Sequence, residues 1–241
     1  MIENIKPYQT RSSRKAEVQQ MFNNISEKYD LANNVLSLGI HQQWKKKCVK
    51  ILQNNKPQVI LDLATGTADL AILLTSLHPQ KIIAADYADR MLQIAQQKIF
   101  QKKLHHIIEV KKEDGEQLSF EDNFFDAITI SFGIRNFENY QKGLQEMYRV
   151  LKPGGVLLIL EFTMPKNKII KALYTFYFKY ILPIIAWFIT RDKKAYDYLP
   201  ASVQAFPQYK VFCNIIQQQG FSKCTYIPLS GGIATIYLAE K

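Results

Sequence analysis

Residues 59–71, VILDLATGTADLA, have the pattern of a buried strand that runs through a tight turn into a helix. The apolar run predicts a strand covered on both faces, and a helix is expected from about Ala68. In parallel α/β sheets, ligands bind outside the carboxyl ends of the strands, where the first turn leads into a helix. The turn around Gly66, between Asp62 and Asp69, is therefore the first candidate for a ligand site.

The middle of the chain repeats this alternation of strand and helix. Strand and helix recurring at this spacing are typical of a parallel α/β sheet. Besides the strand at 59–64, the apolar runs predict strands over 81–86, 106–110, 125–132 and 156–162, with helices over 88–100 and 139–151.

The C-terminal part departs from this rhythm. A helix near 208–219 is followed by two strands, 223–229 and 233–240, joined by Ser-Gly-Gly. Two adjacent strands with a short glycine turn form a hairpin. The predicted fold is therefore an α/β fold with a mostly parallel, seven-stranded sheet, in which an antiparallel strand of the C-terminal hairpin forms one edge.

One domain is expected over 1–241, because a chain of this length with 47% hydrophobic residues can bury one sizeable core. The pattern divides it into an N-terminal helical cap over 12–54 and a ligand-binding core over 55–165. An aromatic and apolar insertion over 166–200 follows, facing substrate or membrane, and then the C-terminal helix and hairpin over 201–241.

The formal charge of +10 would suit an anionic partner, either nucleic acid or an acidic lipid surface. Many of the lysines are single or in short groups such as 45–47, which is also the pattern of ordinary solvated helix faces. Net charge alone therefore does not distinguish a protein that binds an anionic partner from one with ordinary solvated helix surfaces.

The three cysteines, Cys48, Cys213 and Cys224, show no CxxC or Cys/His ligand spacing. This argues against a disulfide framework and against zinc, so we expect reduced thiols and no metal site. The first fifteen residues lack the apolar segment of a signal peptide, which predicts a cytoplasmic protein.

Residues 172–190, ALYTFYFKYILPIIAWFIT, are nearly as long and apolar as a membrane-spanning helix, but Lys179 and Pro183 interrupt them. A core helix or a lipid-facing lid is the expected structure. Aromatic side chains are concentrated here: Tyr174, Phe176, Tyr177, Phe178, Tyr180, Trp187 and Phe188.

The turn at Gly66 is poorly equipped for phosphates, since neither GxGxxG nor GxxxxGK is present. It offers acids instead, because Asp62, Asp69, Asp86 and Asp114 lie at or near successive strand ends. Asp86 follows Gly66 by 20 residues, the offset at which a carboxylate reaches ribose hydroxyls. A positively charged nucleoside without phosphate fits these acids, and S-adenosylmethionine is such a ligand.

Four blocks of sequence carry a resemblance to a known family. They are YDLANNVLSLGIHQQWKKK (29–47), LDLATGTADLA (61–71), ITISFGIRNFEN (128–139) and RVLKPGGVLLILEFTMP (149–165). The chain resembles the quinone-biosynthesis C-methyltransferases, which methylate the ring of demethylmenaquinol or of a polyprenyl benzoquinol. The segments around 176–189 and 195–207 resemble the demethylmenaquinone branch, whose reaction is the last step of menaquinone biosynthesis.

This resemblance implies the Rossmann-like class I fold of S-adenosylmethionine-dependent methyltransferases. It places the cofactor contacts on Thr67, Asp86, Asp114, Gly115 and Ser131. The chain departs from the family pattern mildly, and the altered positions are Thr65 and Ala68, where glycines are common, and Ala32 and Asn34, which replace Met and Asp. Ala68 leaves less room near the methionine end of the cofactor.

Methyl transfer to a ring carbon needs an ionised quinol hydroxyl, so a general base is expected above the cofactor. His41 has the most suitable ordinary pKa, about 6.5. Arg135 could stabilise a phenolate or pair with Glu138 or Glu161. The candidates for the catalytic site are His41, Arg135 and Asp30, with Tyr29 and Asn136 nearby.

The implied partners are a prenylated quinol, whose tail would lie against the aromatic segment, and membrane lipid in peripheral contact on the inner face of the membrane. Nucleic acid is not an expected partner. The net charge taken alone would favour an RNA methyltransferase, which is one alternative function. A non-catalytic nucleotide-binding or membrane-associated protein is a further alternative. A dehydrogenase is the least favoured, because the dinucleotide fingerprint is absent. The sequence leaves the oligomeric state open.

Overall fold

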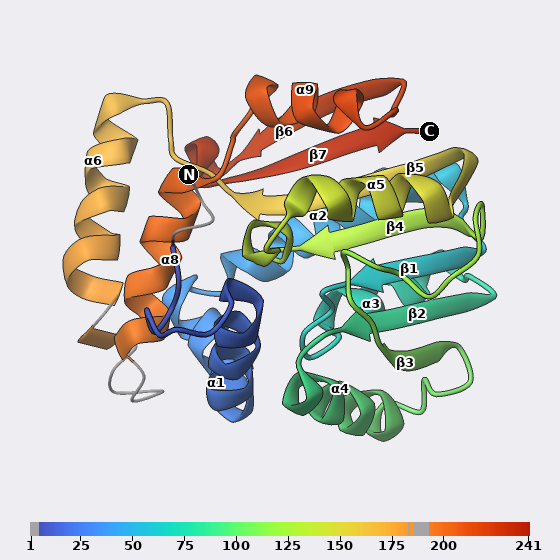
Figure 1. Ribbon diagram of the computed structural model, residues 1–241, viewed down its shortest axis with the longest axis horizontal. Coiled ribbons are helices and arrows are strands. Elements are labelled where there is room, and N and C mark those ends of the chain that lie inside the picture. The colour runs from blue at the N-terminus through green and yellow to red at the C-terminus, as the bar shows by residue number, and fades with distance from the viewer. Residues whose placement is uncertain (1–4, 183, 186–192) are drawn as a thin grey trace.

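A computed structural model describes residues 5–182, 184–185 and 193–241 (Figure 1). In this part of the chain the strands form one seven-stranded sheet in the order β3-β2-β1-β4-β5-β7-β6, which confirms the predicted fold class. The strands are β1 (Val59–Leu63), β2 (Lys81–Asp86), β3 (Ile108–Lys112), β4 (Phe125–Ser131), β5 (Leu151–Phe162), β6 (Lys223–Leu229) and β7 (Ala234–Glu240).

Strands β1 to β5 pair in parallel, and their register brings the predicted ligand-binding turns together. Leu63 of β1 lies opposite Ala85 of β2 and Ile130 of β4. The next residues along these strands therefore leave the sheet at the same edge, which is the usual ligand edge of a parallel sheet.

The expectation of an antiparallel strand at the sheet edge is wrong in one respect. The antiparallel strand is β7, which pairs with β5 on one side and with β6 on the other. The hairpin turn through 230–232 then places β6 at the edge, running parallel to β5. β7 is the more buried of the two, and β6 is half-exposed along much of its length.

Helices cover both faces of the sheet. One core lies between the sheet and α5 (Tyr140–Val150) with α9 (Lys210–Gln218). A second core lies between the opposite face and α2 (Ile40–Leu52), α3 (Asp69–Leu74) and α4 (Asp89–Gln101). The fold is therefore a three-layer α/β/α arrangement, in which the strands are buried as near-continuous apolar runs.

A cap of helices lies beyond the carboxyl ends of the parallel strands, at the left of Figure 1. It contains α1 (Arg14–Leu36), α6 (Lys168–Phe176), the π-helical turn η5 (Tyr177–Ile181) and α8 (Lys193–Ala205). A third core holds these elements together; its members include Val18, Met21, Ile25, Tyr174, Phe178, Leu182 and Tyr198. No helix in the described part of the chain is long and apolar enough to cross a membrane.

The expectation of three reduced thiols is wrong for two of them. Cys213 of α9 and Cys224 of β6 form a disulfide, although they lie 11 residues apart in sequence. The packing of α9 against β6 brings them together, which local spacing does not reveal. Cys48 is a free, buried thiol, and its burial raises its pKa to about 12.

Candidate active site

The turn after β1 is built from residues with left-handed backbone. Ala64, Gly66 and Ala68 all have φ between 52° and 65°. Non-glycine residues rarely adopt this conformation, and such strain gathers at functional sites. Ala68, which stands where the family resemblance expects glycine, is fully buried in this conformation.

Asp62, in β1, forms hydrogen bonds that hold the turn in place. Its carboxylate accepts hydrogen bonds from the hydroxyls of Thr65, at 2.6 Å, and Thr129, at 2.7 Å. Burial raises the pKa of Asp62 to about 6, against the effect of these two donors. Asp62 therefore fixes the shape of the turn.

Asp86, at the end of β2, is hydrogen-bonded to the main chain of this turn. Its carboxylate oxygens accept hydrogen bonds from the main-chain nitrogens of Gly66, at 2.8 Å, and Ala88, at 2.9 Å. Asp86 is in the position that the resemblance assigns to the ribose contact, and it lines a small cavity of about 90 Å³.

Asp114 and Gly115, which follow β3, line the same small cavity. Asp114 pairs with Lys15 of α1, whose ammonium also lies 5.0 Å from the centre of the Tyr87 ring. At Gly115 a Cβ atom would collide with the ring of Phe137, so the main chain packs closely there. The helical cap thus closes over the polar end of the site.

A larger cavity of about 420 Å³ adjoins the small one. The two cavities share five lining residues: Tyr29, Ala64, Gly66, Ser131 and Phe132. The hydroxyl oxygen of Ser131 is buried and has no hydrogen-bond partner among the described residues. Because buried hydroxyls are nearly always paired, this atom indicates a place for a ligand at the shared wall.

Thr67 and Asp30 lie together at the other side of the turn. Thr67 lines the large cavity, and its hydroxyl donates to Asp30 at 2.6 Å. Lys98 of α4 lies 2.8 Å from Asp30 and 2.5 Å from Asp69. Asp30, a catalytic candidate from the sequence, therefore does not line the cavity itself but contacts Thr67, which does.

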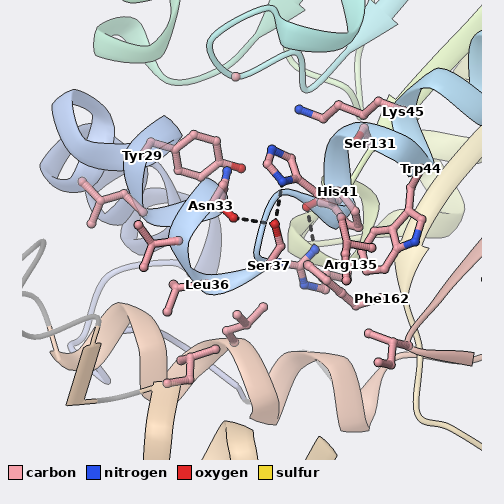
Figure 2. A pocket seen from close by; sticks show the side chains of 18 of the residues that line it. Tyr29, Asn33, Leu36, Ser37, His41, Trp44, Lys45, Ser131, Arg135 and Phe162 are labelled. Atoms are coloured by element: carbon pink, nitrogen blue, oxygen red, sulfur yellow. Dashed lines mark hydrogen bonds between the residues drawn. The ribbon is translucent and has the colours of Figure 1, made fainter. Parts of the chain in front are cut away.

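His41 lines the large cavity and is held by a relay of hydrogen bonds, which Figure 2 shows. The Ser37 hydroxyl donates its one hydrogen to the carbonyl of Asn33 at 2.7 Å, so it accepts from Nδ1 of His41 at 2.6 Å. Nε2 is then the basic nitrogen, and its lone pair accepts a hydrogen bond from the side-chain amide of Gln42 at 3.1 Å. Burial, followed by the charge of Lys45, lowers the pKa of His41 to about 4.

Arg135 lines the large cavity from the turn after β4. Its Nη1 donates to Glu161 and to the carbonyl of Phe132, each at 2.6 Å, and its guanidinium lies 5.4 Å from the centre of the Phe162 ring. Its Nε is buried and has no partner in the described structure. Pairing with Glu161, rather than with Glu138, is the arrangement observed.

Aromatic side chains form the rest of the large cavity. Tyr174, Tyr177 and Phe178 line it, whereas Phe176 and Tyr180 point to solvent. The Tyr174 hydroxyl is buried, and in the described residues it too lacks a partner. Two further members of the predicted aromatic group, at 187 and 188, lie outside the described residues.

Sequence reasoning gave no role to Lys15 or Lys45, which both line the cavities. A signal for Lys45 is present in the helix pattern, because α2 buries positions 41, 44, 45, 48 and 52 on one face. A lysine at a core-facing helical position is unusual unless the charge is paired. Lys15 gives no such signal, since its partner lies 99 residues away in sequence.

The sheet order and the acids at the strand ends define an α/β protein with a Rossmann-like methyltransferase fold. A solved S-adenosylmethionine-dependent methyltransferase from Aquifex aeolicus has this fold, with a TM-score of 0.55 and 18% identity. The match covers 76% of this chain and 81% of that one. At this identity the likeness concerns the fold alone.

The chain belongs to the ubiE/COQ5 methyltransferase family, whose model matches residues 9–241. A demethylmenaquinone methyltransferase from Bacteroides fragilis is 45% identical over 240 residues, which are 99% of this chain and 98% of the relative. A ubiquinone/menaquinone biosynthesis C-methyltransferase from Geobacter sp. strain M21 is 40% identical, over 95% of this chain and 98% of that one. The family resemblance stated from the sequence is confirmed.

Proposed function

We propose that the protein transfers a methyl group from S-adenosylmethionine to the ring of demethylmenaquinol, the last step of menaquinone biosynthesis. One observation carries this proposal: an acid-lined cavity and a larger aromatic cavity share a wall at Gly66 and Ser131. The first suits an adenosine, the second suits a prenylated ring, and the shared wall is where a methyl group would cross. The name of the Bacteroides relative supports the choice of quinol.

The residues at the polar end fit the cofactor. In this proposal Asp86 binds the ribose hydroxyls, Asp114 and Gly115 border the adenine, and Thr67 and Ser131 border the methionine end. S-adenosylmethionine supplies an electrophilic methyl group on a sulfonium, whose charge disappears during transfer. Because no anion has to be stabilised at the methyl group, the chief task of these residues is positioning.

The quinol must be ionised, and Arg135 with Tyr174 is suited to that task. Both present a buried donor that no described residue uses, and both border the aromatic cavity. Burial raises the pKa of Tyr174, so its hydroxyl stays protonated and donates. In this proposal the two donors hold the quinol oxygen next to the reacting carbon, and the guanidinium charge lowers the pKa of that hydroxyl.

In this proposal His41 accepts the quinol proton at Nε2, where the quinol hydroxyl replaces the Gln42 amide, and that amide keeps its other acceptor, Asp69. Its pKa is lowered to about 4, so the imidazole is neutral, and therefore able to accept a proton, at physiological pH. Asp30 does not border the cavity, so we assign it the positioning of Thr67.

A polyprenyl benzoquinol is the second candidate substrate, because the Geobacter relative carries a name that covers both quinones. RNA has less support. The lysines and the arginine that line the cavities are each within reach of a carboxylate, so they do not form a free basic rim in the described structure. Of the aromatic segment as described, Tyr174, Tyr177 and Phe178 line an apolar cavity, so these three rings are not part of an open stacking groove.

The decisive experiment is transfer of labelled methyl from S-adenosylmethionine to chemically reduced demethylmenaquinone, with a polyprenyl benzoquinol and bulk RNA as parallel acceptors. We expect label in the naphthoquinol. Label only in the benzoquinol would move the assignment to ubiquinone biosynthesis. Label only in RNA would overturn the quinol assignment.

We also propose that the enzyme takes its substrate at a membrane surface. Leu38, between α1 and α2, borders the aromatic cavity and is 86% exposed. On the neighbouring α6, Leu173 and Phe176 are exposed too, and Tyr177 joins the two segments through a hydrogen bond to the carbonyl of Leu36 at 2.8 Å. Such exposed apolar side chains beside a cavity suit contact with lipid.

Flotation with anionic liposomes tests this contact. The wild-type protein is expected to float, and the double variant Leu38→Glu, Leu173→Glu is expected to stay at the bottom. Val211→Glu is the control, because Val211 is also an exposed apolar residue but lies on α9, outside the cap. Absence of wild-type protein from the lipid fraction, or equal loss in the control, would contradict the proposal.

A further inference from the structure

Lys45 carries a buried charge with unused hydrogen-bonding capacity. The residue is 8% exposed and borders the large cavity, whose lining also includes Thr65, Gly66 and Thr67 of the glycine turn. Its ammonium has one hydrogen-bond partner among the described residues, the Asp69 carboxylate at 3.2 Å. An ammonium carries three donors, so two have no acceptor in the protein as described. Figure 2 shows the amino group above the imidazole of His41.

Asp69 does not depend on Lys45 alone. Its other oxygen lies 2.5 Å from Lys98, and the amide of Gln42 donates to the same oxygen that Lys45 approaches. Although burial acts in the opposite direction, the two lysines hold the pKa of Asp69 at about 2. Asp69 thus stays ionised. Because Asp69 directly follows the glycine turn, its ion pair holds the Lys45 ammonium at the end of that turn and uses one of its three donors.

The other two cations that border the cavities in the described part of the chain pair with carboxylates other than Asp69. Lys15 pairs with Asp114 at the adenosine end. Arg135 pairs with Glu161 at the aromatic end. Among the lysines and arginines that border the cavities in the described structure, Lys45 is the one at the turn where the amino-acid end of the cofactor belongs.

We propose that Lys45 binds the α-carboxylate of the methionine moiety of S-adenosylmethionine. The inference rests on the proposed use of this cofactor. Charge-assisted hydrogen bonds to a carboxylate are the strong ones, and a desolvated lysine gains most from them. The amino-acid end brings an ammonium together with its carboxylate, so its arrival leaves the charge balance around Lys45 and Asp69 unchanged.

Calorimetric titration with two adenosine ligands tests the contact without measuring catalysis. S-adenosylhomocysteine keeps the carboxylate, whereas 5′-methylthioadenosine lacks the whole amino-acid tail. For Lys45→Met we expect the affinity for S-adenosylhomocysteine to fall about tenfold to a hundredfold. Binding of 5′-methylthioadenosine should stay at the wild-type level, which also shows that the variant is folded. Lys45→Arg should keep much of the affinity for S-adenosylhomocysteine.

Lys46→Met is the matched control, because Lys46 is the exposed neighbour on the same helix, and it should bind both ligands normally. Equal loss of both ligands in Lys45→Met would mean that Lys45 only supports the shape of the site, and the proposal would fail. Unchanged binding of S-adenosylhomocysteine would overturn it as well. If the wild-type protein bound neither ligand, the proposed cofactor itself would be wrong.

Discussion

Arg14 donates a hydrogen bond from Nη2 to the main-chain carbonyl of Arg135, at 2.6 Å. The same guanidinium also donates to the carbonyl of Phe137, and Arg14 is only 1% exposed. The first turn of α1 therefore holds the turn after β4 in place. One arginine positions the other at the aromatic cavity.

Arg14→Met should loosen this turn. Three main-chain carbonyls, those of Ile5, Arg135 and Phe137, lose their donor. We therefore expect the free energy of unfolding to fall by about 3 kcal/mol, and kcat to fall with it. Urea unfolding and the methyl-transfer assay measure the two effects. Arg11→Met is the control, because Arg11 is exposed. Similar stability of both variants would show that the contact is not needed.

Ser131→Ala should weaken cofactor binding without weakening the fold. The Ser131 hydroxyl has no partner among the described residues and borders both cavities. Removing it deletes an unpaired polar atom, so thermal unfolding without ligand should be unchanged or occur at slightly higher temperature. The affinity for S-adenosylmethionine should fall about tenfold in calorimetric titration. A clear loss of stability without ligand would contradict this view.

His41 should make stability depend on pH. Its pKa is lowered to about 4, whereas an unfolded histidine titrates near 6.5. Between these values the unfolded chain binds a proton there that the folded chain does not, so this contribution to stability falls as the pH drops from about 6.5 towards 4. Asp62, with a pKa raised to about 6, acts in the opposite direction.

The comparison with His41→Gln isolates the histidine, because both proteins contain Asp62. Urea titrations at about pH 7, 6 and 5 should show the stability of the wild type falling relative to the variant as the pH decreases. A difference that stays constant over this range would mean that His41 titrates normally in the folded protein.

Two measurements test the Cys213–Cys224 disulfide: the number of reactive thiols, and the free energy of unfolding with and without a reductant. The protein denatured without a reductant should show one reactive thiol, that of Cys48. After reduction all three cysteines should react. Closing an 11-residue separation contributes about 3 kcal/mol, so a reductant should lower the stability of the wild type by about that amount. Cys224→Ser should not respond to the reductant. Three thiols in the unreduced protein would show that the pair is open.

Local patterns predicted the parallel half of the sheet well. The strand over 81–86 has the expected bounds, because an apolar run buried on both faces is visible in the sequence itself. Asp86 and Asp114 line one cavity, as their positions near strand ends predict, because the end of a parallel strand is a local property and parallel register brings such ends together.

What could not be predicted depends on contacts between distant segments. Arg14 and Arg135 lie 121 residues apart, and no periodicity links them. Likewise, the hairpin pattern showed that 223–229 pairs with 233–240, but which of the two strands joins β5 depends on how α9 packs. The block 29–47 predicts Asp30 near the site, but the sequence does not show that its carboxylate accepts a hydrogen bond from Thr67 and does not border the cavity.

The position of β7 inside the sheet has a consequence for synthesis on the ribosome. β5 is complete once Phe162 has emerged, but its free edge has no partner until β7 arrives, more than seventy residues later. During that interval an apolar strand edge is open, which is the kind of surface that nascent chains use to aggregate. Stalling or truncation before β7 should therefore leave an aggregation-prone chain, even though the cofactor-binding strands have already been made.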